Sequence, residues 1–428
     1  MQTIASDKLK AVVGMGATGL SVARFLYARG ERFVMLDTRA EPPLLETFEA
    51  EFPNVNIELG ELRADNLTLA DEIILSPGVP LQQPVLREVS EQGVSIIGDI
   101  ELFAREAQAP VVAGMRAGVG GNLGTPALEL LDESCDLYVL ELSSFQLETV
   151  KKLNAEVAVV LNISPDHMDR YDSIQAYHAA KHRIFQGAKQ VVVNRADALS
   201  QPLLASGVRS WSFALDRPDI DGFGLIEHEG EPWLAYQFDP LMPEADVAMK
   251  GSHNTENALA ALALGSAIEL PMEVMLQTLK QFRGLPHRCQ TVADKAGVSY
   301  INDSKATNVG ATIAAVVGLS HNLPKNNALI LIAGGQGKAQ DFTPLGRVLK
   351  GRVKLVVLIG EDARVMGAAL EDRVEVVYAT SLLAAVTAAR DVAQPGDRIV
   401  LSPACASFDM FDGFEDRGEQ FVAAVEGL

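Results

Sequence analysis

The chain has 428 residues, of which 48% are hydrophobic and 21% are charged, and its formal net charge is -20. This composition excludes disordered and fibrous proteins, the length predicts about three domains, and the acidic balance argues against general nucleic-acid binding, since a phosphate backbone would be repelled. The first residues lack the pattern of a signal peptide, the three cysteines are scattered, and no apolar run reaches the ~20 residues that span a bilayer. We therefore expect a cytoplasmic protein without membrane insertion.

Short apolar runs alternate with helical patterns along most of the chain. Such alternation predicts an α/β fold with mostly parallel sheets covered by helices. Glycine and proline interrupt the periodicity near residues 98 and 284, so we expect domains at 1–98, 99–285 and 286–428. Beyond the opening β-α-β pattern, the runs that read as buried strands are Glu156 to Ile163, Gln190 to Asn194, Ala328 to Ala333, Val353 to Ile359 and Arg398 to Leu401.

A glycine-rich loop follows the first apolar run, Leu9 to Val13, and precedes the helical segment Leu20 to Arg29. Its sequence, Gly14 to Gly19, fits G-x-G-x-x-G, in which glycines let the backbone approach a pyrophosphate at a helix N-terminus. Asp37-Thr38-Arg39 follows the next strand, at the position where residues that bind ribose or uracil would lie. An NAD-dependent oxidoreductase and a plain glycine turn are the alternatives, although nothing downstream resembles hydride-transfer machinery.

Polar side chains follow apolar runs in the middle of the chain. Glu141 comes directly after Leu137 to Leu140, and a carboxylate at the carboxyl end of a parallel strand suits Mg²⁺. His167 follows another such run and could bind a metal or a phosphate, although a lone histidine is more often structural. Asn122 lies in a loop between glycines, and Lys181 lies in a helical segment where most lysines are merely solvated.

Four loops in the last part of the chain combine polar residues and glycines. The segment Gly251 to Asn257 opens a helix with two asparagines, which suit the edge of adenine or, alternatively, a helix N-cap. The other three follow apolar runs, and together the four indicate a site for a phosphorylated and carboxylated ligand. These three are Asp303 to Asn308, Gly334 to Lys338 and Ser402 to Asp409.

The order of these motifs resembles the Mur ligase family over essentially the whole chain. The motifs are G-x-G-x-x-G, Gly-Gly-Asn-Leu-Gly-Thr-Pro, Glu-Leu-Ser-Ser-Phe-Gln-Leu-Glu, Asp-His-Met-Asp-Arg-Tyr, His-Asn-x-x-Asn, Leu-Pro-His-Arg, Asp-Ser-Lys-Ala-Thr-Asn and Ser-Pro-Ala-Cys-Ala-Ser. The last two are most similar to the branch that adds D-glutamate. The Asn-Pro-Arg motif of the diaminopimelate-adding branch is missing, and folylpolyglutamate synthases lack the N-terminal nucleotide domain.

The resemblance implies three domains: a Rossmann-like domain for a UDP-sugar, a central P-loop-type ATPase domain, and a Rossmann-like domain for the amino acid. It implies a monomeric enzyme of peptidoglycan precursor synthesis that uses ATP and Mg²⁺. Its reaction would join D-glutamate to UDP-N-acetylmuramoyl-L-alanine through an acyl phosphate, made by transfer of the γ-phosphoryl group of ATP.

The resemblance also implies a role for individual residues. The catalytic and Mg²⁺-binding residues would be Glu141, His167 and a carbamylated Lys181. ATP would be held by Asn254, Asn257, Arg288, Asp303 and Lys305. The UDP-sugar would be held by Gly14, Gly16, Thr18, Gly19, Asp37, Thr38, Arg39, Ser76, Gly78 and Asn122. The D-glutamate pocket would consist of Thr307, Lys338, Ser407 and Phe414.

The sequence departs from the family in one place. The family carries a P-loop after the strand that corresponds to Ala109–Ala113, yet no G-x-x-x-x-G-K-[ST] occurs in this chain and Ala113 runs directly into Gly114. Residues 111–112 and 117–119 both read as strand, and a crossover between parallel strands needs about a dozen residues or more. We expect that a loop and helix of roughly twenty residues are lost here. Either the printed chain omits them, or the protein is a UDP-muramoyl-binding relative with almost no ligase activity.

Overall fold

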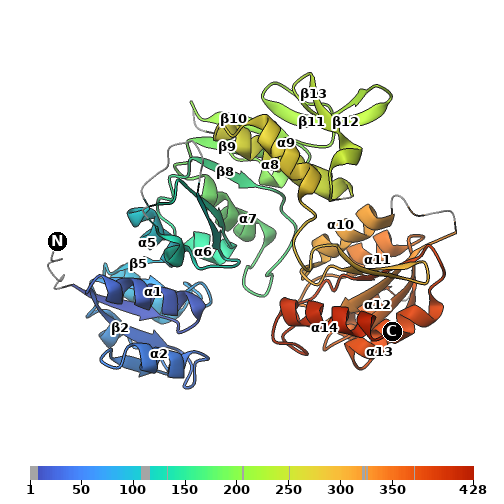
Figure 1. Cartoon of the computed structure of the whole chain (residues 1–428). Coiled ribbons are helices and arrows are strands. Elements are labelled where there is room, and N and C mark those ends of the chain that lie inside the picture. Colours follow the sequence, from blue (N-terminus) through green and yellow to red (C-terminus); the bar gives the residue numbers. More distant parts are fainter. Residues whose placement is uncertain are drawn as a thin grey trace. The chain divides into compact units, whose positions relative to one another are not determined.

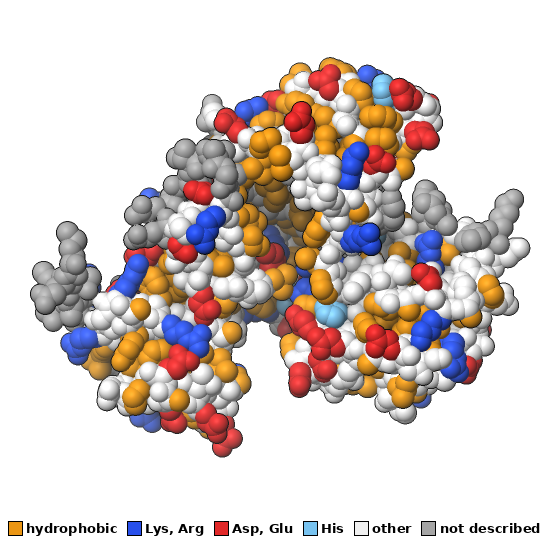
Figure 2. Space-filling model, in the orientation of Figure 1, with side chains coloured by type: hydrophobic (Ala, Val, Ile, Leu, Met, Phe, Trp, Pro, Cys, Tyr) orange, Lys and Arg blue, Asp and Glu red, His pale blue; other side chains and the backbone are white. Residues whose placement is uncertain are grey.

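The computed structural model describes residues 8–107, 116–132, 134–204, 207–249, 251–320, 323, 326–370 and 372–428. Contacts between Cα atoms divide the chain into two compact units, one of residues 1–160, 178–191 and 202–209 and one of residues 161–177, 192–201 and 210–428. Figure 1 traces the chain, and Figure 2 shows acidic and basic side chains interspersed on the visible face. The predicted α/β class is confirmed, since sheets with parallel strands and intervening helices recur along the chain. The domain boundaries at 98 and 285 stay predictions.

The first sheet is parallel and has the strand order β3-β2-β1-β4-β5. Its strands are β1 (Leu9–Val13), β2 (Arg32–Asp37), β3 (Ile57–Leu59), β4 (Glu72–Leu75) and β5 (Ser95–Ile97). The intervening helices are α1 (Ala17–Ala28), α2 (Leu45–Glu51), α3 (Ala64–Leu67) and α4 (Pro84–Glu91), and α5 (Asp99–Glu106) follows β5. The helix predicted from Leu20 thus begins one turn earlier, directly after Gly16.

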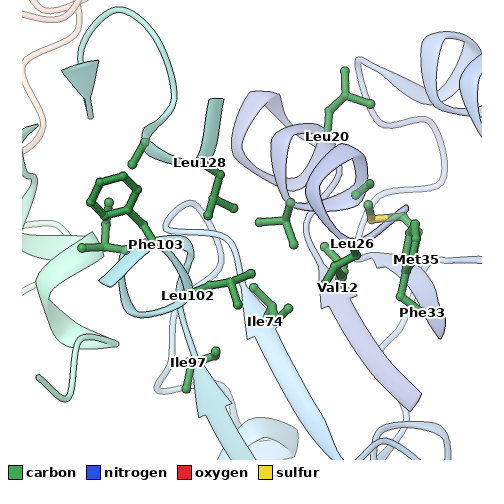
Figure 3. Close-up of a cluster of buried hydrophobic side chains, with 14 of the residues drawn as sticks. Val12, Leu20, Leu26, Phe33, Met35, Ile74, Ile97, Leu102, Phe103 and Leu128 are labelled. Atoms are coloured by element: carbon green, nitrogen blue, oxygen red, sulfur yellow. The ribbon is translucent and has the colours of Figure 1, made fainter. Parts of the chain in front are cut away.

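Both faces of this sheet are buried, because alternate residues of its central strands enter two different cores. Val12 and Ile74 join a cluster with Leu26 of α1, while Val13 and Ile73 join a cluster on the opposite face. Figure 3 shows the first cluster, in which Phe103 of α5 and Leu128 also take part. The rigid sheet therefore holds the loops that leave its strands in fixed positions.

The first unit continues with a two-stranded parallel sheet of β6 (Ala117–Gly121) and β7 (Leu137–Glu141). The 3-10 helix η1 (Ala127–Leu130) joins these strands, and α6 (Ser144–Glu148) follows β7. A strand was predicted at 117–119 and is confirmed. The junction between Ala113 and Gly114, together with the strand predicted at 109–113, falls within 108–115, outside the described residues.

A second sheet has the order β13-β12-β11-β10-β9-β8. In it β10 and β11 pair in parallel, while β11, β12 and β13 form an antiparallel meander that the sequence did not predict. Its strands are β8 (Val157–Val160), β9 (Gln190–Asn194), β10 (Arg209–Phe213), β11 (Gly222–His228), β12 (Glu231–Tyr236) and β13 (Asp239–Pro243). The strand predicted at Glu156 to Ile163 is shorter than expected. The helices of this part of the chain are α7 (Ile174–His182), η2 (Arg183–Phe185), η3 (Ala198–Ser200), η4 (Glu244–Asp246), α8 (Ser252–Ala267) and α9 (Met272–Gln281).

The last sheet has the order β14-β15-β19-β16-β17-β18, with β14 antiparallel and the others parallel. Its strands are β14 (Gln290–Lys295), β15 (Val298–Asn302), β16 (Leu329–Gly334), β17 (Val353–Ile359), β18 (Glu375–Tyr378) and β19 (Arg398–Leu401). The helices are α10 (Val309–Ser320), α11 (Thr343–Leu349), α12 (Ala363–Leu370), α13 (Leu382–Val392) and α14 (Phe414–Glu426). Alternate residues of β16 enter two cores, so both faces are covered. Among the described residues, no helix has the length and apolarity needed to cross a bilayer.

Candidate functional site

The glycine-rich loop after β1 is a tight turn that needs Gly14 and Gly19. Gly14 has φ +103°, and its N–H donates to the carbonyl of Leu36 at 2.7 Å. A Cβ at Gly19 would lie 1.9 Å from the carbonyl oxygen of Gly14, whereas a Cβ at Gly16 would meet nothing within 4 Å. The Ser76 hydroxyl, from the end of β4, donates to the same Gly14 carbonyl at 2.9 Å. Since the strand order reverses between β1 and β4, these loops lie where α/β sheets bind nucleotides.

The carboxylate of Asp37 organises the loop after β2. It is buried and accepts hydrogen bonds from the Met15 N–H at 2.6 Å, the Arg39 N–H at 2.8 Å and the Arg39 guanidinium at 2.7 and 2.9 Å. Burial raises the pKa of Asp37, but these hydrogen bonds outweigh it and hold the pKa below its ordinary value. Asp37 thus ties the glycine loop to the Asp37–Arg39 segment and holds the half-exposed Arg39 side chain.

The loops after β6 and β7 bring Asn122 and Glu141 together. Gly121 pairs with Glu141 in the parallel register, and the Asn122 amide Nδ2 donates to Glu141 Oε2 at 3.0 Å. A capping box between Ser143 and Gln146 begins α6 two residues later. Both side chains are exposed, and carboxylate and amide oxygens are ligands that Mg²⁺ prefers, so this pair fits part of a magnesium site.

The other two predicted magnesium ligands lie on separate parts of the chain. His167 has φ +55° in the loop after β8 and belongs to the second unit, whereas Glu141 and Lys181 of α7 belong to the first. Among the described residues, no group of three or more His, Cys, Asp or Glu side chains is arranged to hold a metal. The combination of Glu141, His167 and Lys181 therefore stays a prediction.

The two asparagines predicted to hold adenine lie in the first turns of α8. The N-cap residue of this helix is Gly251, with φ +105° and no side-chain cap, so the N-cap interpretation of Asn254 and Asn257 is wrong. The helix begins at Ser252 rather than at the alanine-rich segment. Beside them, burial lowers the pKa of His253, whose Nδ1 has no hydrogen-bond partner among the described residues.

Asp303 is buried directly after β15 and is held by the neighbouring strand. It accepts the Ser402 hydroxyl at 2.8 Å and the Cys289 N–H at 3.1 Å. Burial raises its pKa to about 6, against the opposing effect of these hydrogen bonds and of the Arg288 charge. The nearby Arg288 is exposed. Of these two predicted ATP-binding residues, Arg288 is thus accessible to a ligand, while Asp303 holds the loop in place.

The loops that follow β15, β16 and β19 meet at the carboxyl ends of these strands. Backbone hydrogen bonds join them: the Ala404 N–H donates to Ala306 at 2.9 Å, the Gly334 N–H donates to Pro403 at 2.9 Å, and Gln336 pairs with Ala406. The structure therefore brings the loops that carry Thr307, Lys338 and Ser407 to one edge of the sheet, while the amino-acid pocket stays a prediction. Ser407 itself is buried.

Two predicted residues, one of the ATP site and one of the amino-acid pocket, interact at this edge. The Lys305 ammonium lies 3.9 Å from the centre of the Phe414 ring. The Lys338 ammonium lies 3.7 Å from Asp166 Oδ1, and the Asn308 amide donates to Asp166 Oδ2 at 3.1 Å. The sequence predicted no role for Asp166 itself. It pointed to the neighbouring His167 as a metal ligand and included Asp166 only in a motif.

Arg417 is a residue that the sequence did not indicate at all. It lies on α14, is fully buried, and donates to the Ser304 hydroxyl at 2.9 Å, the Ser304 carbonyl at 2.8 Å and the Cys405 carbonyl at 3.2 Å. Burial lowers its pKa to about 10. It thereby holds the loops after β15 and β19 against each other. An arginine in an amphipathic helix normally reads as a surface residue, so no sequence signal marked it.

Comparison with known sequences gives a consistent family. Residues 8–98 match the N-terminal domain of MurD-like Mur ligases, residues 122–265 match the Mur ligase middle domain, and residues 287–405 match the Mur ligase glutamate ligase domain. The UDP-N-acetylmuramoylalanine–D-glutamate ligases of Pseudomonas aeruginosa and Pseudomonas fluorescens Pf0-1 are 52% and 51% identical over the full length of both chains. The Acinetobacter baylyi ligase of the same name is 47% identical over 98% of each chain.

The alignments also reveal a difference in length. The alignment with the Pseudomonas fluorescens ligase has 449 positions, 21 more than the 428 residues of this chain, and covers both chains in full. At least 21 positions therefore carry a residue of the relative and none of this chain.

Solved structures support the fold at much lower identity. A pseudomurein peptide ligase type C from Methanothermus fervidus gives a TM-score of 0.55 at 17% identity, covering 98% of this chain and 100% of that one. The UDP-N-acetylmuramate-alanine ligase MurC of Thermotoga maritima gives 0.53 at 16% identity, covering 98% and 99%. Taken with the full-length sequence relatives, these findings show that the chain belongs to the Mur ligase family, in its MurD-like branch.

Proposed function

We propose that this protein performs the ATP-dependent joining of D-glutamate to UDP-N-acetylmuramoyl-L-alanine in peptidoglycan precursor synthesis. The observation that carries this proposal is the identity of about half of all residues, over the whole chain, with ligases of that name. The three domain matches in their expected order support it. An NAD-dependent oxidoreductase is not favoured, because the N-terminal match is to a MurD-like domain.

The reaction requires that a carboxylate become a usable acyl donor. Transfer of the γ-phosphoryl group of ATP to the carboxylate of UDP-N-acetylmuramoyl-L-alanine forms an acyl phosphate and releases ADP. The neutral amine of D-glutamate then attacks the acyl carbon, and the bond from that carbon to the phosphate oxygen breaks. As phosphate leaves, the nitrogen loses one of its two protons and keeps the other in the new amide. Bound Mg²⁺ would screen the negative charges of the phosphoryl groups.

We assign the residues of this chain as follows. The turn of Gly14 to Gly19 and the segment Asp37–Arg39, with Ser76 and Gly78, would hold the UDP moiety. Asn122 and Glu141 would face magnesium, joined by His167 and a carbamylated Lys181. ATP would lie against Asn254, Asn257, Arg288, Asp303 and Lys305. D-glutamate would place its carboxylates against Thr307, Lys338, Ser407 and Phe414.

A second candidate function is UDP-muramoyl binding without turnover. It rests on one observation, that the chain contains no G-x-x-x-x-G-K-[ST], and the full-length ligase relatives do not favour it. Without that loop the γ-phosphate would lose its cradle of backbone N–H groups and its lysine. The N-terminal nucleotide loops do not depend on it, so binding of the UDP-sugar would persist.

One experiment separates the two functions. Ligation is measured by mass-spectrometric detection of the dipeptide product, with D- and L-glutamate, for the printed chain and for a chain that carries the corresponding Pseudomonas aeruginosa segment between Ala113 and Gly114. The proposed function predicts that the printed chain joins D-glutamate and not L-glutamate, whereas the second function predicts ligation by the restored chain alone. A restored chain that joins another amino acid, or none, would refute the proposed reaction. A fully active printed chain would refute the second function.

A further inference from the structure

Helix α7 carries two histidines one turn apart, in the sequence His178-Ala179-Ala180-Lys181-His182. Residues at positions i and i+4 lie on the same face of a helix, with Cβ atoms about 5–6 Å apart. The two imidazole rings are stacked, with centroids 3.8 Å apart and an interplanar angle of 29°. Both residues are partly exposed. Neither histidine is assigned a role in the proposed ligation.

The neighbouring residues hold the end of this helix in place. The Arg183 guanidinium donates to the Leu147 carbonyl at 2.6 Å and also to the Val150 carbonyl, at and just after the end of α6. The Phe185 ring meets the His182 ring edge-on, with centroids 5.4 Å apart. All these residues belong to the first unit. The contacts fix the backbone that carries the two histidines, and a site whose ligands are already held in place loses less entropy on binding.

Two histidines at this spacing suit a transition metal. A neutral imidazole binds Zn²⁺ through one nitrogen at about 2.0–2.1 Å, and its other nitrogen keeps an N–H for a hydrogen bond. Two such bonds to one ion place the ligand nitrogens about 3 Å apart. Because the ring centroids of His178 and His182 are 3.8 Å apart, rotation about side-chain bonds is sufficient to reach that separation. The same helical spacing supplies two of the ligands in H-E-x-x-H zinc sites.

The pair lacks the further groups of a zinc enzyme. The residue after His178 is Ala179, at the position where H-E-x-x-H sites have their glutamate base. In the part of the chain that the structure describes, no group of three or more His, Cys, Asp or Glu side chains could hold a metal, so water would complete the coordination. Imidazole ligands suit Zn²⁺, Ni²⁺ and Cu²⁺, whereas Mg²⁺ takes oxygen ligands. The pair is therefore suited to binding rather than catalysis, and to a different metal from the magnesium expected at Glu141.

We propose that His178 and His182 form a two-histidine site for a divalent transition metal of the class of Zn²⁺ and Ni²⁺ on the last turn of α7. The ion would link the two ends of that turn. Because the unfolded chain does not hold the two imidazoles together, the metal binds the folded form more tightly and stabilises it. Lys181 belongs to the same turn, so the bound ion would also fix the backbone that carries it. The site does not depend on the proposed function.

Calorimetric titration of the whole chain with ZnCl₂, and in parallel with NiCl₂, tests this site. His178→Ala and His182→Ala should each weaken the binding of both metals about a hundredfold, because the second imidazole no longer binds at the effective concentration that the helix sets. Alanine is the best helix former, so both variants should keep the fold, which circular dichroism verifies. Titration with MgCl₂ should give the same result for the variants and the wild type, because Mg²⁺ takes oxygen ligands.

Two matched controls remove other side chains that bind metals. His228→Ala removes a histidine of β11 whose side chain is 40% exposed, and Cys135→Ser removes a partly exposed thiol. Both controls should bind Zn²⁺ as the wild type does. A loss of binding in either control, with none in His178→Ala, would place the metal elsewhere and overturn the proposal.

A second measurement identifies the ligands directly. In a chain with ¹³C-labelled histidines, substoichiometric Cu²⁺ should broaden two of the seven imidazole signals first, and these should be the two that His178→Ala and His182→Ala remove. Absence of metal binding by the wild type, or binding that only one of the two substitutions weakens, would refute the two-histidine site. None of these measurements involves ligation, so the proposal and the proposed function can fail separately.

Discussion

Asp99 offers a sharp test of the energetics of this fold. It is the first residue of α5 and is 3% exposed. Its Oδ2 accepts a hydrogen bond from the Gln146 amide at 3.4 Å, while Oδ1 has no hydrogen-bond partner among the described residues. Burial raises the pKa of Asp99 from 3.8 to about 6. The folded protein therefore holds the proton of Asp99 at a pH where the unfolded chain has lost it.

This difference fixes the sign and size of a pH effect. Because the folded pKa is the higher one, the stability that Asp99 contributes is full below pH 3.8, falls as the pH rises, and is lost above about pH 6. A pKa unit is worth about 1.4 kcal/mol, so the loss is roughly 3 kcal/mol. Asp99→Asn cannot ionise, and its free energy of unfolding should rise by most of that amount relative to wild type between pH 4 and pH 7. Any constant offset from the new amide does not affect this slope.

Hydrogen exchange of the α5 amides, corrected for intrinsic rates, measures the unfolding of this unit across the pH range. Glu101→Gln is the matched control on the same helix. Glu101 accepts the N–H groups of Lys151 and Lys152 at 2.8 and 3.0 Å, and although burial raises its pKa, these bonds hold the pKa below its ordinary value. Its stabilisation should instead be lost as the pH falls. A difference between Asp99→Asn and wild type that stays constant over this range would refute the reasoning.

Two further predictions concern the candidate sites. Gly19→Ala should weaken the binding of UDP-N-acetylmuramoyl-L-alanine about tenfold or more in calorimetry, because its Cβ would lie 1.9 Å from the Gly14 carbonyl and overpacking costs ~1–3 kcal/mol. Leu69→Ala, at a side chain that is 72% exposed and outside the assigned site, should bind normally, and equal affinities for both variants would contradict this. Arg417→Met should lower the free energy of unfolding by ~3 kcal/mol in urea titrations, because buried acceptors of Ser304 and Cys405 lose their donor. As a control, Arg390→Met, at an exposed side chain on α13, should lower it by less than ~0.5 kcal/mol. Similar losses for both variants would show that the buried hydrogen bonds of Arg417 contribute little to stability.

Hydrophobic periodicity predicted the buried strands well. The runs Gln190–Asn194, Val353–Ile359 and Arg398–Leu401 were predicted with the bounds that the structure shows. A strand covered on both faces is a continuous apolar run, which stands out in a sequence. The antiparallel meander of β11 to β13 was not predicted. Its strands mix apolar with charged residues, and its turn at Glu229 and Gly230, both with positive φ, gave only a weak signal.

The motif loops were also predicted, but their internal chemistry was not. The sequence indicated that Asp37 and Asp303 lie in nucleotide loops. It did not indicate that Arg39 and Met15 donate hydrogen bonds to the Asp37 carboxylate. Nor did it indicate that Ser402 and Cys289 donate hydrogen bonds to Asp303. Met15, Cys289 and Ser402 lie 22, 14 and 99 positions along the chain from the carboxylates that they contact, so no local pattern records them.

The sequence by itself determined the α/β class, the order of the motif loops and the membership of a ligase family, because strand burial, glycine turns and motif spacing are local properties of the chain. Only the tertiary structure decided which polar side chains are exposed and which are buried and hold the loops. Arg417 shows the reason. Its burial depends on the packing of α14 against the loops that carry Ser304 and Cys405, and the sequence around Arg417 does not record that packing. The exposure of Val119 and Val139, at 64% and 50%, has the same origin, because exposure is a property of what packs nearby rather than of the residue itself.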